Sequence, residues 1–217
     1  MNASSLLLRE QMIAACRQLE QTGLNRGTSG NVSCRHEDHF LITPSGVPVA
    51  KLDAAGIVAM NFEGNVIGTG TPSSEWHFHL GLLKNRPELN AIVHTHSPHA
   101  TALACLREDL PSFHYMIAIA GGDSIRCAPY ALFGTEALSA CTIAAMKDRK
   151  ACLLANHGLI AAGRDLDEAM AVAIEIESLC GQYLIARQSG KPVLLSADEM
   201  QAVIERFRSY GRNANPA

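Results

Sequence analysis

Apolar residues recur along this chain with two different spacings, which distinguish its helices from its strands. Between residues 3 and 22 the apolar positions lie three or four apart, as on one face of a helix, and Gly23 follows as a stop signal. Capping-box patterns mark the start of two further helices, at Asp165 and Ser196. The predicted helices cover residues 3–22, 74–86, 98–107 and 135–147 and the segments that begin at 165 and 196.

Short apolar runs bounded by polar turns predict the strands. Turns at 36–38 and 63–65 join neighbouring runs into hairpins. The predicted strands cover residues 31–35, 39–43, two segments within 57–68, 91–96, 115–119, 125–129, 151–155 and 159–162. Because tight turns join several of them, we expect an α/β fold in one domain, 1–217, with a largely antiparallel central sheet flanked by helices.

The composition excludes several functional classes. With 47% hydrophobic and 18% charged residues in 217 positions, the chain can bury an ordinary globular core. Its net charge of −3, without a Lys/Arg stripe, argues against a nucleic-acid partner. The seven cysteines form no C-x-x-C pair, which argues against a zinc ribbon and suits a reducing cytoplasm. No segment has the pattern of a signal peptide or a membrane span, so we expect a cytoplasmic protein without a membrane partner.

Three histidines are candidates for a metal site. His94 and His96 end the predicted strand 91–96, where residues two apart point to the same face with Cα atoms roughly 6.6 Å apart. His157 follows the apolar strand 151–155, and the end of a buried strand is a common place for a site. Three neutral imidazoles with an open coordination position suit catalytic zinc. The pair 94 and 96 alone is equally compatible with a half-exposed strand.

The predicted helix 74–86 carries three more titratable residues of interest. His77 and His79 lie two apart and therefore point to different faces, so we interpret both as non-ligands. Glu75 lies in the first turn, where a carboxylate ordinarily interacts with the helix dipole. The alternative role is that of a carboxylate beside the metal, which acts as acid and base.

Three short segments have the composition of an anion-binding site: residues 28–31 (TSGN), 43–46 (TPSG) and 72–75 (PSSE). Each combines hydroxyl side chains with Gly or Pro, and such turns direct backbone N–H groups toward an anion. The third leads into a helix, whose N-terminus also favours phosphate. Any one of them alone is explained more simply as an ordinary turn or helix start.

These motifs occur together in one known family. The matching stretches are GTSGNVS (27–33), LITPSG (41–46), PSSEW (72–76), VHTH (93–96), HYMIAIAGG (114–122), CAPYALFGT (127–135) and NHGLIA (156–161). In this order, and over nearly the whole chain, they resemble the class II aldolase/adducin-head family, most closely its bacterial L-fuculose-1-phosphate aldolase-like branch. The resemblance implies an α/β fold around an antiparallel sheet and a C4 homotetramer with active sites at subunit boundaries.

The resemblance also implies a metal site. His94, His96 and His157 would bind Zn²⁺, with Mn²⁺ or Co²⁺ as other possible metals. Glu75 would bind the metal in the empty enzyme and move aside to become the acid and base. No Schiff-base lysine is needed for such a mechanism.

The remaining implied roles concern the substrate. The residues that would hold its phosphate are Asn31, Ser45, Gly46, Ser73 and Ser74. Tyr115, contributed by the neighbouring subunit, and Tyr210 would act near the aldehyde half of the substrate. Phe133 would line the same end.

The function that the resemblance implies is zinc-dependent retro-aldol cleavage of a ketose 1-phosphate to dihydroxyacetone phosphate and a short aldehyde. Candidate substrates are L-fuculose 1-phosphate, 5-deoxyribulose 1-phosphate and 5-methylthioribulose 1-phosphate. The alternatives on this fold are a methylthioribulose-1-phosphate dehydratase and a pentulose-5-phosphate 4-epimerase. Glu75 argues against the epimerase, whose branch has Asp at this position. A non-catalytic, adducin-like scaffold would be expected to lack the histidines.

Overall fold

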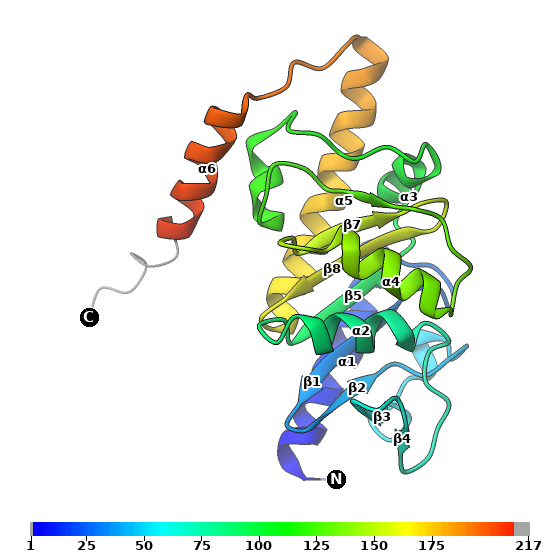
Figure 1. Cartoon of the computed structure of the whole chain (residues 1–217). Coiled ribbons are helices and arrows are strands. Elements are labelled where there is room, and N and C mark those ends of the chain that lie inside the picture. The colour runs from blue at the N-terminus through cyan, green and yellow to red at the C-terminus, as the bar shows by residue number, and fades with distance from the viewer. Residues whose placement is uncertain (1, 211–217) are drawn as a thin grey trace.

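An eight-stranded sheet forms the centre of the computed structural model, which describes residues 2–210 and the side chains of residues 2–207 (Figure 1). Its strand order is β4-β3-β2-β1-β5-β8-β7-β6, and every neighbouring pair is antiparallel except β6 and β7. The strands are β1 (Asn31–His36), β2 (His39–Ile42), β3 (Val58–Asn61), β4 (Val66–Ile67), β5 (Ala91–Thr95), β6 (Cys127–Ala128), β7 (Ala151–Leu154) and β8 (Gly158–Gly163). The predicted largely antiparallel sheet is therefore confirmed.

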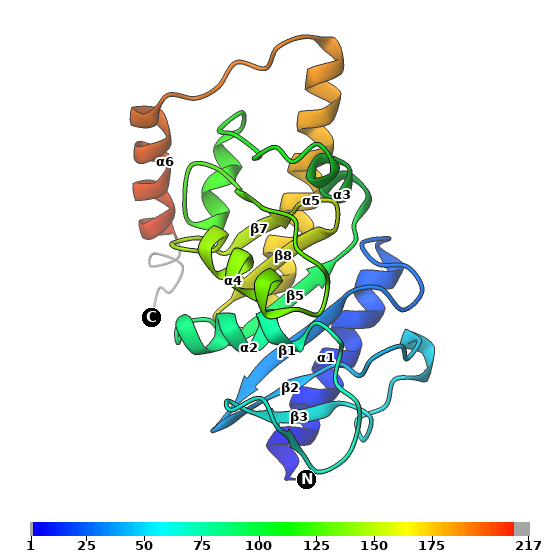
Figure 2. The same ribbon diagram turned by 45° about the vertical axis from the view of Figure 1, so that its right-hand side comes forward.

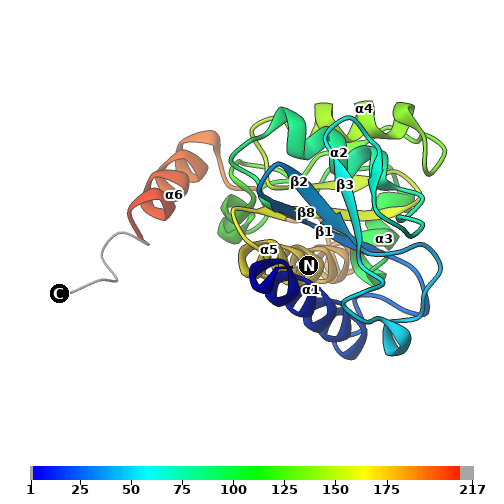
Figure 3. The ribbon, with the colours of Figure 1, turned by 90° about the horizontal axis from the view of Figure 1, so that it is seen from below.

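Helices cover both faces of this sheet. The helices are α1 (Ala3–Gln21), α2 (Trp76–Asn85), α3 (Pro98–Cys105), α4 (Glu136–Ala145), α5 (Leu166–Ser189), α6 (Ala197–Tyr210) and the short 3₁₀-helices η1 (Val49–Lys51) and η2 (Tyr115–Ala120). Side chains of α1, α3 and α5 share one buried apolar cluster, and those of α2 and α4 share another. Figure 3 shows α1 and α5 on one side of the sheet and α2 and α4 on the other.

The two-residue period of the strands decides which side chains reach which layer. In β5, Val93 packs in the cluster with α1 and α5, whereas Ile92 packs in the cluster with α2 and α4. His94 lies two positions after Ile92 and therefore points toward α2, where its ring centroid is 5.5 Å from that of Phe78. The end of β5 thus aims a histidine at the start of α2.

The prediction of a strand over residues 115–119 is wrong, because this segment forms the 3₁₀-helix η2. Its buried residues, Ile117, Ala118 and Ala120, do not alternate as they would in a strand. The segment ends at Gly121, whose φ of 89° lies in the left-handed region that glycine adopts readily. A short apolar run does not distinguish a strand from a helical turn by periodicity, and here the turn prevails.

The C-terminal helix α6 stands away from the sheet and packs against η2 (Figures 1 and 2). It follows α5, which is long and apolar enough to cross a membrane by length and composition alone. Half of the apolar window of α5 is buried inside the molecule, and the helix packs along β8. This is the position of a core helix, so α5 is weak evidence for a membrane span.

Candidate active site

Three imidazole rings meet where the end of β5 lies beside the start of β8. His94 belongs to β5, His96 follows it directly, and His157 lies in the turn between β7 and β8. The three pairs of ring centroids are 4.8, 4.9 and 4.9 Å apart. The Nε2 atoms of His94 and His96 are 3.0 Å apart. The antiparallel pairing of β5 with β8 is what brings His157 against the other two.

Gly158 makes this close approach possible. A Cβ atom at this position would lie 2.3 Å from the carbonyl oxygen of Thr95 and 3.1 and 3.3 Å from the rings of His96 and His94. Asn156, two residues earlier, adopts a left-handed backbone with φ of 54°. The tight turn and the missing side chain together let the β7–β8 connection lie close against the end of β5.

The ring of His94 is held in one orientation. It is fully buried, and its Nδ1–H donates to the carbonyl oxygen of Leu159 at 3.0 Å. This hydrogen bond leaves the lone pair of Nε2 directed at the centre of the cluster, as metal-ligating histidines require. His96 is the solvent-exposed member of the three, and its backbone N–H donates to Oδ1 of Asn25 at 3.1 Å.

Glu75 completes the cluster. It is the N-cap residue of α2, yet its side chain makes no capping hydrogen bond and turns to the histidines instead. Its Oε2 lies 3.2 Å from Nε2 of His94, and its Oε1 lies 3.1 Å from Nε2 of His157. Burial raises the pKa of this carboxyl, but the opposing effects of His94 and His157 outweigh it and leave the pKa well below its usual range. The ordinary helix-dipole role therefore does not describe this residue.

These donors fit a divalent metal ion. Three imidazole nitrogens and a carboxylate oxygen form a donor set that zinc commonly takes. The buried Oε1 of Glu75 makes no hydrogen bond within the described residues, so an electropositive partner at the centre of the cluster would satisfy it. The described residues contain one group of three or more His, Cys, Asp or Glu side chains close enough to share an ion, and it is His94, His96 and His157.

A cavity of about 330 Å³ opens beside the cluster and contains the predicted anion segments. It is lined by Thr28, Ser29, Gly30, Asn31, Pro44, Ser45, Gly46, Ser73, Ser74, Glu75, His96, Tyr130, Ala131, Phe133, Asn156 and His157. All five residues predicted to hold phosphate thus lie in one cavity with Glu75 and two of the histidines. Segments far apart in the sequence meet here, which no single motif could show.

Backbone pairing holds two of the anion segments side by side. The N–H of Ser45 donates to the carbonyl of Thr71 and the N–H of Ser73 to that of Thr43, both at 3.0 Å. These two N–H groups are therefore already engaged. Within the described residues, the hydroxyls of Ser45 and Ser74 make no hydrogen bond, so they and the backbone around Gly46 and Ser74 are the donors left for an anion.

Asn31 has a more central role than the sequence suggested. Its Nδ2 donates to Oε2 of Glu75 at 2.9 Å, and its Oδ1 lies 2.5 Å from Nε2 of His79. His79 in turn bonds Ser33 Oγ through Nδ1 at 2.7 Å. His79 lies outside the cluster of His94, His96 and His157, and burial, with the nearby His94, lowers its pKa to about 3 despite the opposing effect of Glu75. The ring is therefore neutral at physiological pH.

Of the predicted catalytic residues, Tyr115 does not join the site within one chain. Tyr115 does not line the cavity beside the histidines; its side chain is 51% exposed and lies in a separate apolar groove with Val203 and Phe207 of α6. Tyr210 belongs to α6, but its side chain lies outside the described residues.

Sequence reasoning missed several residues that shape the site. Asn25 is buried between His96 and Gly30, and a Cβ on Gly30 would lie 2.2 Å from its Nδ2. Tyr130 lines the cavity next to Phe133, and the guanidinium of Arg107 lies 6.0 Å from its ring centroid. Their contacts connect distant segments, so no local pattern identified them.

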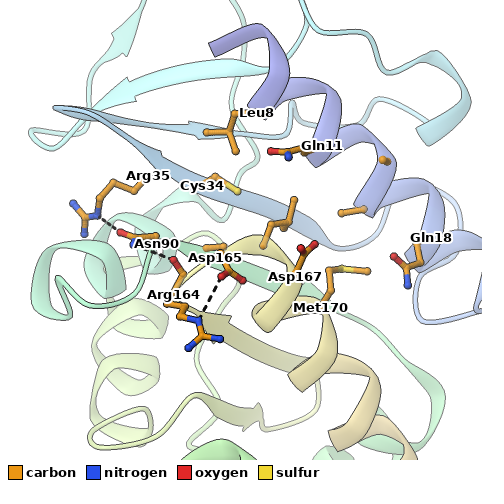
Figure 4. A pocket seen from close by; sticks show the side chains of 14 residues that line it. Leu8, Gln11, Gln18, Cys34, Arg35, Asn90, Arg164, Asp165, Asp167 and Met170 are labelled. Carbon is orange, nitrogen blue, oxygen red and sulfur yellow. Dashed lines mark hydrogen bonds and ion pairs between the residues drawn. The ribbon is translucent and has the colours of Figure 1, made fainter. Parts of the chain in front are cut away.

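Figure 4 shows a second cavity, of about 380 Å³, between α1, β1 and the start of α5. It lies toward the other end of β1 from Asn31, and no predicted site residue lines it. Its polar groups largely satisfy one another: Arg35 donates to Asn90 at 3.1 Å, and Arg164 pairs with Asp165 at 3.5 Å. Nothing in its chemistry competes with the histidine cluster as the candidate active site.

Comparison with known proteins agrees with this geometry. Residues 10–184 match the family described as Class II Aldolase and Adducin N-terminal domain. The chain belongs to this family.

Relatives of known name span almost its whole length. The 5-methylthioribulose-1-phosphate/5-deoxyribulose-1-phosphate aldolase of Rhodospirillum rubrum is 50% identical over 214 residues, 99% of this chain and 97% of the relative. The L-fuculose phosphate aldolase of Escherichia coli K12 is 46% identical over 94% of this chain and 95% of its own. A solved L-fuculose 1-phosphate aldolase superposes with a TM-score of 0.91 at 39% identity, covering 96% and 98% of the two chains.

We expect Gly158→Ala to destabilise the metal-free protein by about 1–3 kcal/mol, because the added Cβ must displace Thr95 or the histidine turn. Urea unfolding measures this change, and a zinc titration should show weaker binding in parallel. The matched control is Gly56→Ala, where the nearest atom is a side-chain oxygen at 3.3 Å and we expect a change within about 0.5 kcal/mol. If both substitutions changed the free energy of unfolding by the same amount, the close approach at Gly158 would not be important for stability.

The buried His79 predicts a pH dependence of stability. Its pKa falls from 6.5 in an exposed ring to about 3 in the fold, so between these values the unfolded chain binds the extra proton. Stability of the metal-free protein should therefore be fully present above about pH 6.5 and decline as the pH falls toward 3. Urea unfolding across this range should show that the free energy of unfolding falls less steeply with decreasing pH in His79→Leu than in the wild type. Identical pH dependences of the two proteins would refute the assignment.

Proposed function

We propose that this protein is a zinc-dependent aldolase that cleaves a ketose 1-phosphate to dihydroxyacetone phosphate and a short aldehyde. The observation that carries the proposal is the position of Glu75, 3.1–3.2 Å from the Nε2 atoms of two clustered histidines and at the wall of a cavity rich in hydroxyl groups. Such a site places an acid and base between a metal position and an anion position. The cytoplasm is its proposed location.

The cavity orients the substrate. Its phosphate is held by the hydroxyls of Ser45, Ser73 and Ser74, by the backbone at Gly46 and by the start of α2, with Asn31 beside them. The reacting carbons then face His94, His96, His157 and Glu75, the residues that would hold the metal. When bound, a divalent cation supplies Lewis acidity to the oxygens on which negative charge develops.

The protein's own groups move the protons. A base takes the proton from the C4 hydroxyl, and the C3–C4 bond breaks. The aldehyde leaves, and the electron pair of the broken bond remains on C3. Glu75 moves aside from the histidines, takes up the proton released from the C4 hydroxyl and delivers it to C3. The proposed relay for this proton is Tyr115 of a second copy of the chain. We propose that the copies form a homotetramer with fourfold rotational symmetry and active sites at subunit boundaries. The exposure of Tyr115 in one chain is consistent with this arrangement.

The aldehyde end of the substrate faces an apolar wall. Tyr130 and Phe133 line the cavity and are 56% and 62% exposed in the single chain. A methyl or methylthio group suits such a wall better than a polar terminus does. The three candidate substrates all have such an end. The Rhodospirillum rubrum relative is named for 5-methylthioribulose 1-phosphate and 5-deoxyribulose 1-phosphate, and the Escherichia coli relative for L-fuculose phosphate. The alternatives on this fold, dehydration and epimerisation, would release no aldehyde.

We expect dihydroxyacetone phosphate to be released from one or more of L-fuculose 1-phosphate, 5-deoxyribulose 1-phosphate and 5-methylthioribulose 1-phosphate. A coupled assay for this product measures the three rates with zinc, with a chelator, and after zinc is restored. The chelator should abolish release and zinc should restore it, and the ratio of rates identifies the preferred aldehyde. Metal-loaded protein that releases no product from any of the three would overturn the aldolase assignment in favour of the dehydratase or epimerase.

A further inference from the structure

We propose that His79 is a positioning residue that fixes the amide of Asn31 and, through it, holds the Glu75 carboxylate at the metal centre. The inference rests on the proposed function only in that Glu75 has to move during the reaction. Four buried side chains form one chain of hydrogen bonds: Ser33 Oγ to His79 Nδ1 at 2.7 Å, His79 Nε2 to Asn31 Oδ1 at 2.5 Å, and Asn31 Nδ2 to Glu75 Oε2 at 2.9 Å. Their exposures are 0%, 0%, 6% and 7% in that order.

The chemistry of Glu75 fixes the direction of every bond in this chain. An ionised carboxylate only accepts, so the Asn31 group that faces it must be the NH₂ and not the carbonyl. The Asn31 carbonyl then faces His79, and because it only accepts, Nε2 of His79 must carry the hydrogen. The other nitrogen, Nδ1, is left to accept from the hydroxyl of Ser33. One tautomer of His79 satisfies all four groups.

This arrangement makes a flipped Asn31 unfavourable. A rotated amide would set its carbonyl against the Glu75 carboxylate and its NH₂ against the N–H of His79. The first contact is repulsive and cannot be relieved by water because the groups are buried, and the second would require His79 to exchange its tautomer. Glu75 therefore selects the orientation of the Asn31 amide, and the hydrogen bond from His79 holds the amide in it.

The orientation matters because Asn31 also lines the substrate cavity. Its amide nitrogen carries two hydrogens on one rigid plane, so fixing the hydrogen that faces Glu75 also fixes the second. When Glu75 moves aside, the NH₂ group remains aimed at the place that the carboxylate occupied. This series of hydrogen bonds thus holds Glu75 in the resting site and keeps the Asn31 NH₂ group in place for the return of the carboxylate.

The sequence places these groups in a simple pattern. Asn31 and Ser33 lie two apart on β1 and share a face of the sheet. Glu75 and His79 lie four apart at the start of α2 and share a face of that helix. The four hydrogen-bonding groups therefore join the first strand to the second helix at two levels, beside the histidine cluster.

The test compares three substitutions. His79→Gln keeps an N–H donor for Asn31, His79→Leu removes it, and His77→Leu is the matched control on the same helix because Nδ1 of His77 makes no hydrogen bond. We expect His79→Leu to weaken zinc binding and lower kcat by about 10- to 100-fold each, as the loss of such supporting groups does elsewhere. We expect His79→Gln and His77→Leu to stay within about threefold of the wild type on the same scale.

Zinc binding is measured by competition with a chromophoric chelator, without substrate, so this readout does not depend on the proposed reaction. If wild-type protein releases no dihydroxyacetone phosphate but His79→Leu still loses zinc affinity and His79→Gln does not, the reaction is wrong and the positioning role stands. If the wild type is active and His79→Leu matches it, or if His79→Gln is as impaired as His79→Leu, the positioning role is overturned.

Folding of each variant is checked by circular dichroism and thermal melting. Ser33→Ala provides a second route should His79→Leu fail to fold, because it leaves the imidazole in place and removes the hydroxyl that orients the ring through Nδ1, so zinc binding should weaken. We expect histidine-selective ¹H–¹⁵N spectra of the metal-free wild type to show His79 with hydrogen on Nε2, and Ser33→Ala to keep this tautomer because the Asn31 carbonyl selects it. A wild-type His79 with hydrogen on Nδ1 would contradict the proposal.

Discussion

A buried carboxylate is stable only where cationic or hydrogen-bonding groups surround it, and this requirement organises the centre of the molecule around Glu75. Its Oε2 lies 3.2 Å from Nε2 of His94 and 2.9 Å from the Asn31 amide nitrogen, and its Oε1 lies 3.1 Å from Nε2 of His157. These partners come from β5, the β7–β8 turn and β1, three parts of the chain that meet because β1, β5 and β8 are neighbours in the sheet. The strand order therefore brings these polar groups together around the Glu75 carboxylate.

The surrounding backbone keeps that assembly compact. Gly158 lets the histidine turn approach Thr95, and the Asn25 side chain fits against Gly30 while it accepts a hydrogen bond from the backbone of His96. Because Asn25 contacts both Gly30 and His96, it links the loop of the proposed phosphate site to a proposed metal ligand. Substitutions at these positions should therefore disturb metal and substrate sites together.

Much of this could be predicted from sequence, because local spacing carries the information. The i, i+2 pair His94 and His96 and the tight turns predicted a shared face and an antiparallel sheet. The segment from Tyr115 to Ala120 could not be assigned, since a short apolar run fits a strand or a helical turn equally. The roles of Asn25 and His79 depend on contacts between distant buried polar groups, which have no periodicity. The assignment of Tyr115 to a neighbouring subunit stays a prediction.

X-ray absorption at the zinc edge of the loaded protein would test the central claim, that these histidines and Glu75 form a metal centre. We expect a first shell of three imidazole nitrogens at about 2.0–2.1 Å with oxygen as the remaining ligand. We also expect a variant with His94, His96 and His157 all replaced by Ala to lose this spectrum. A sulfur shell at about 2.3 Å, or an imidazole shell that survives the triple substitution, would contradict it.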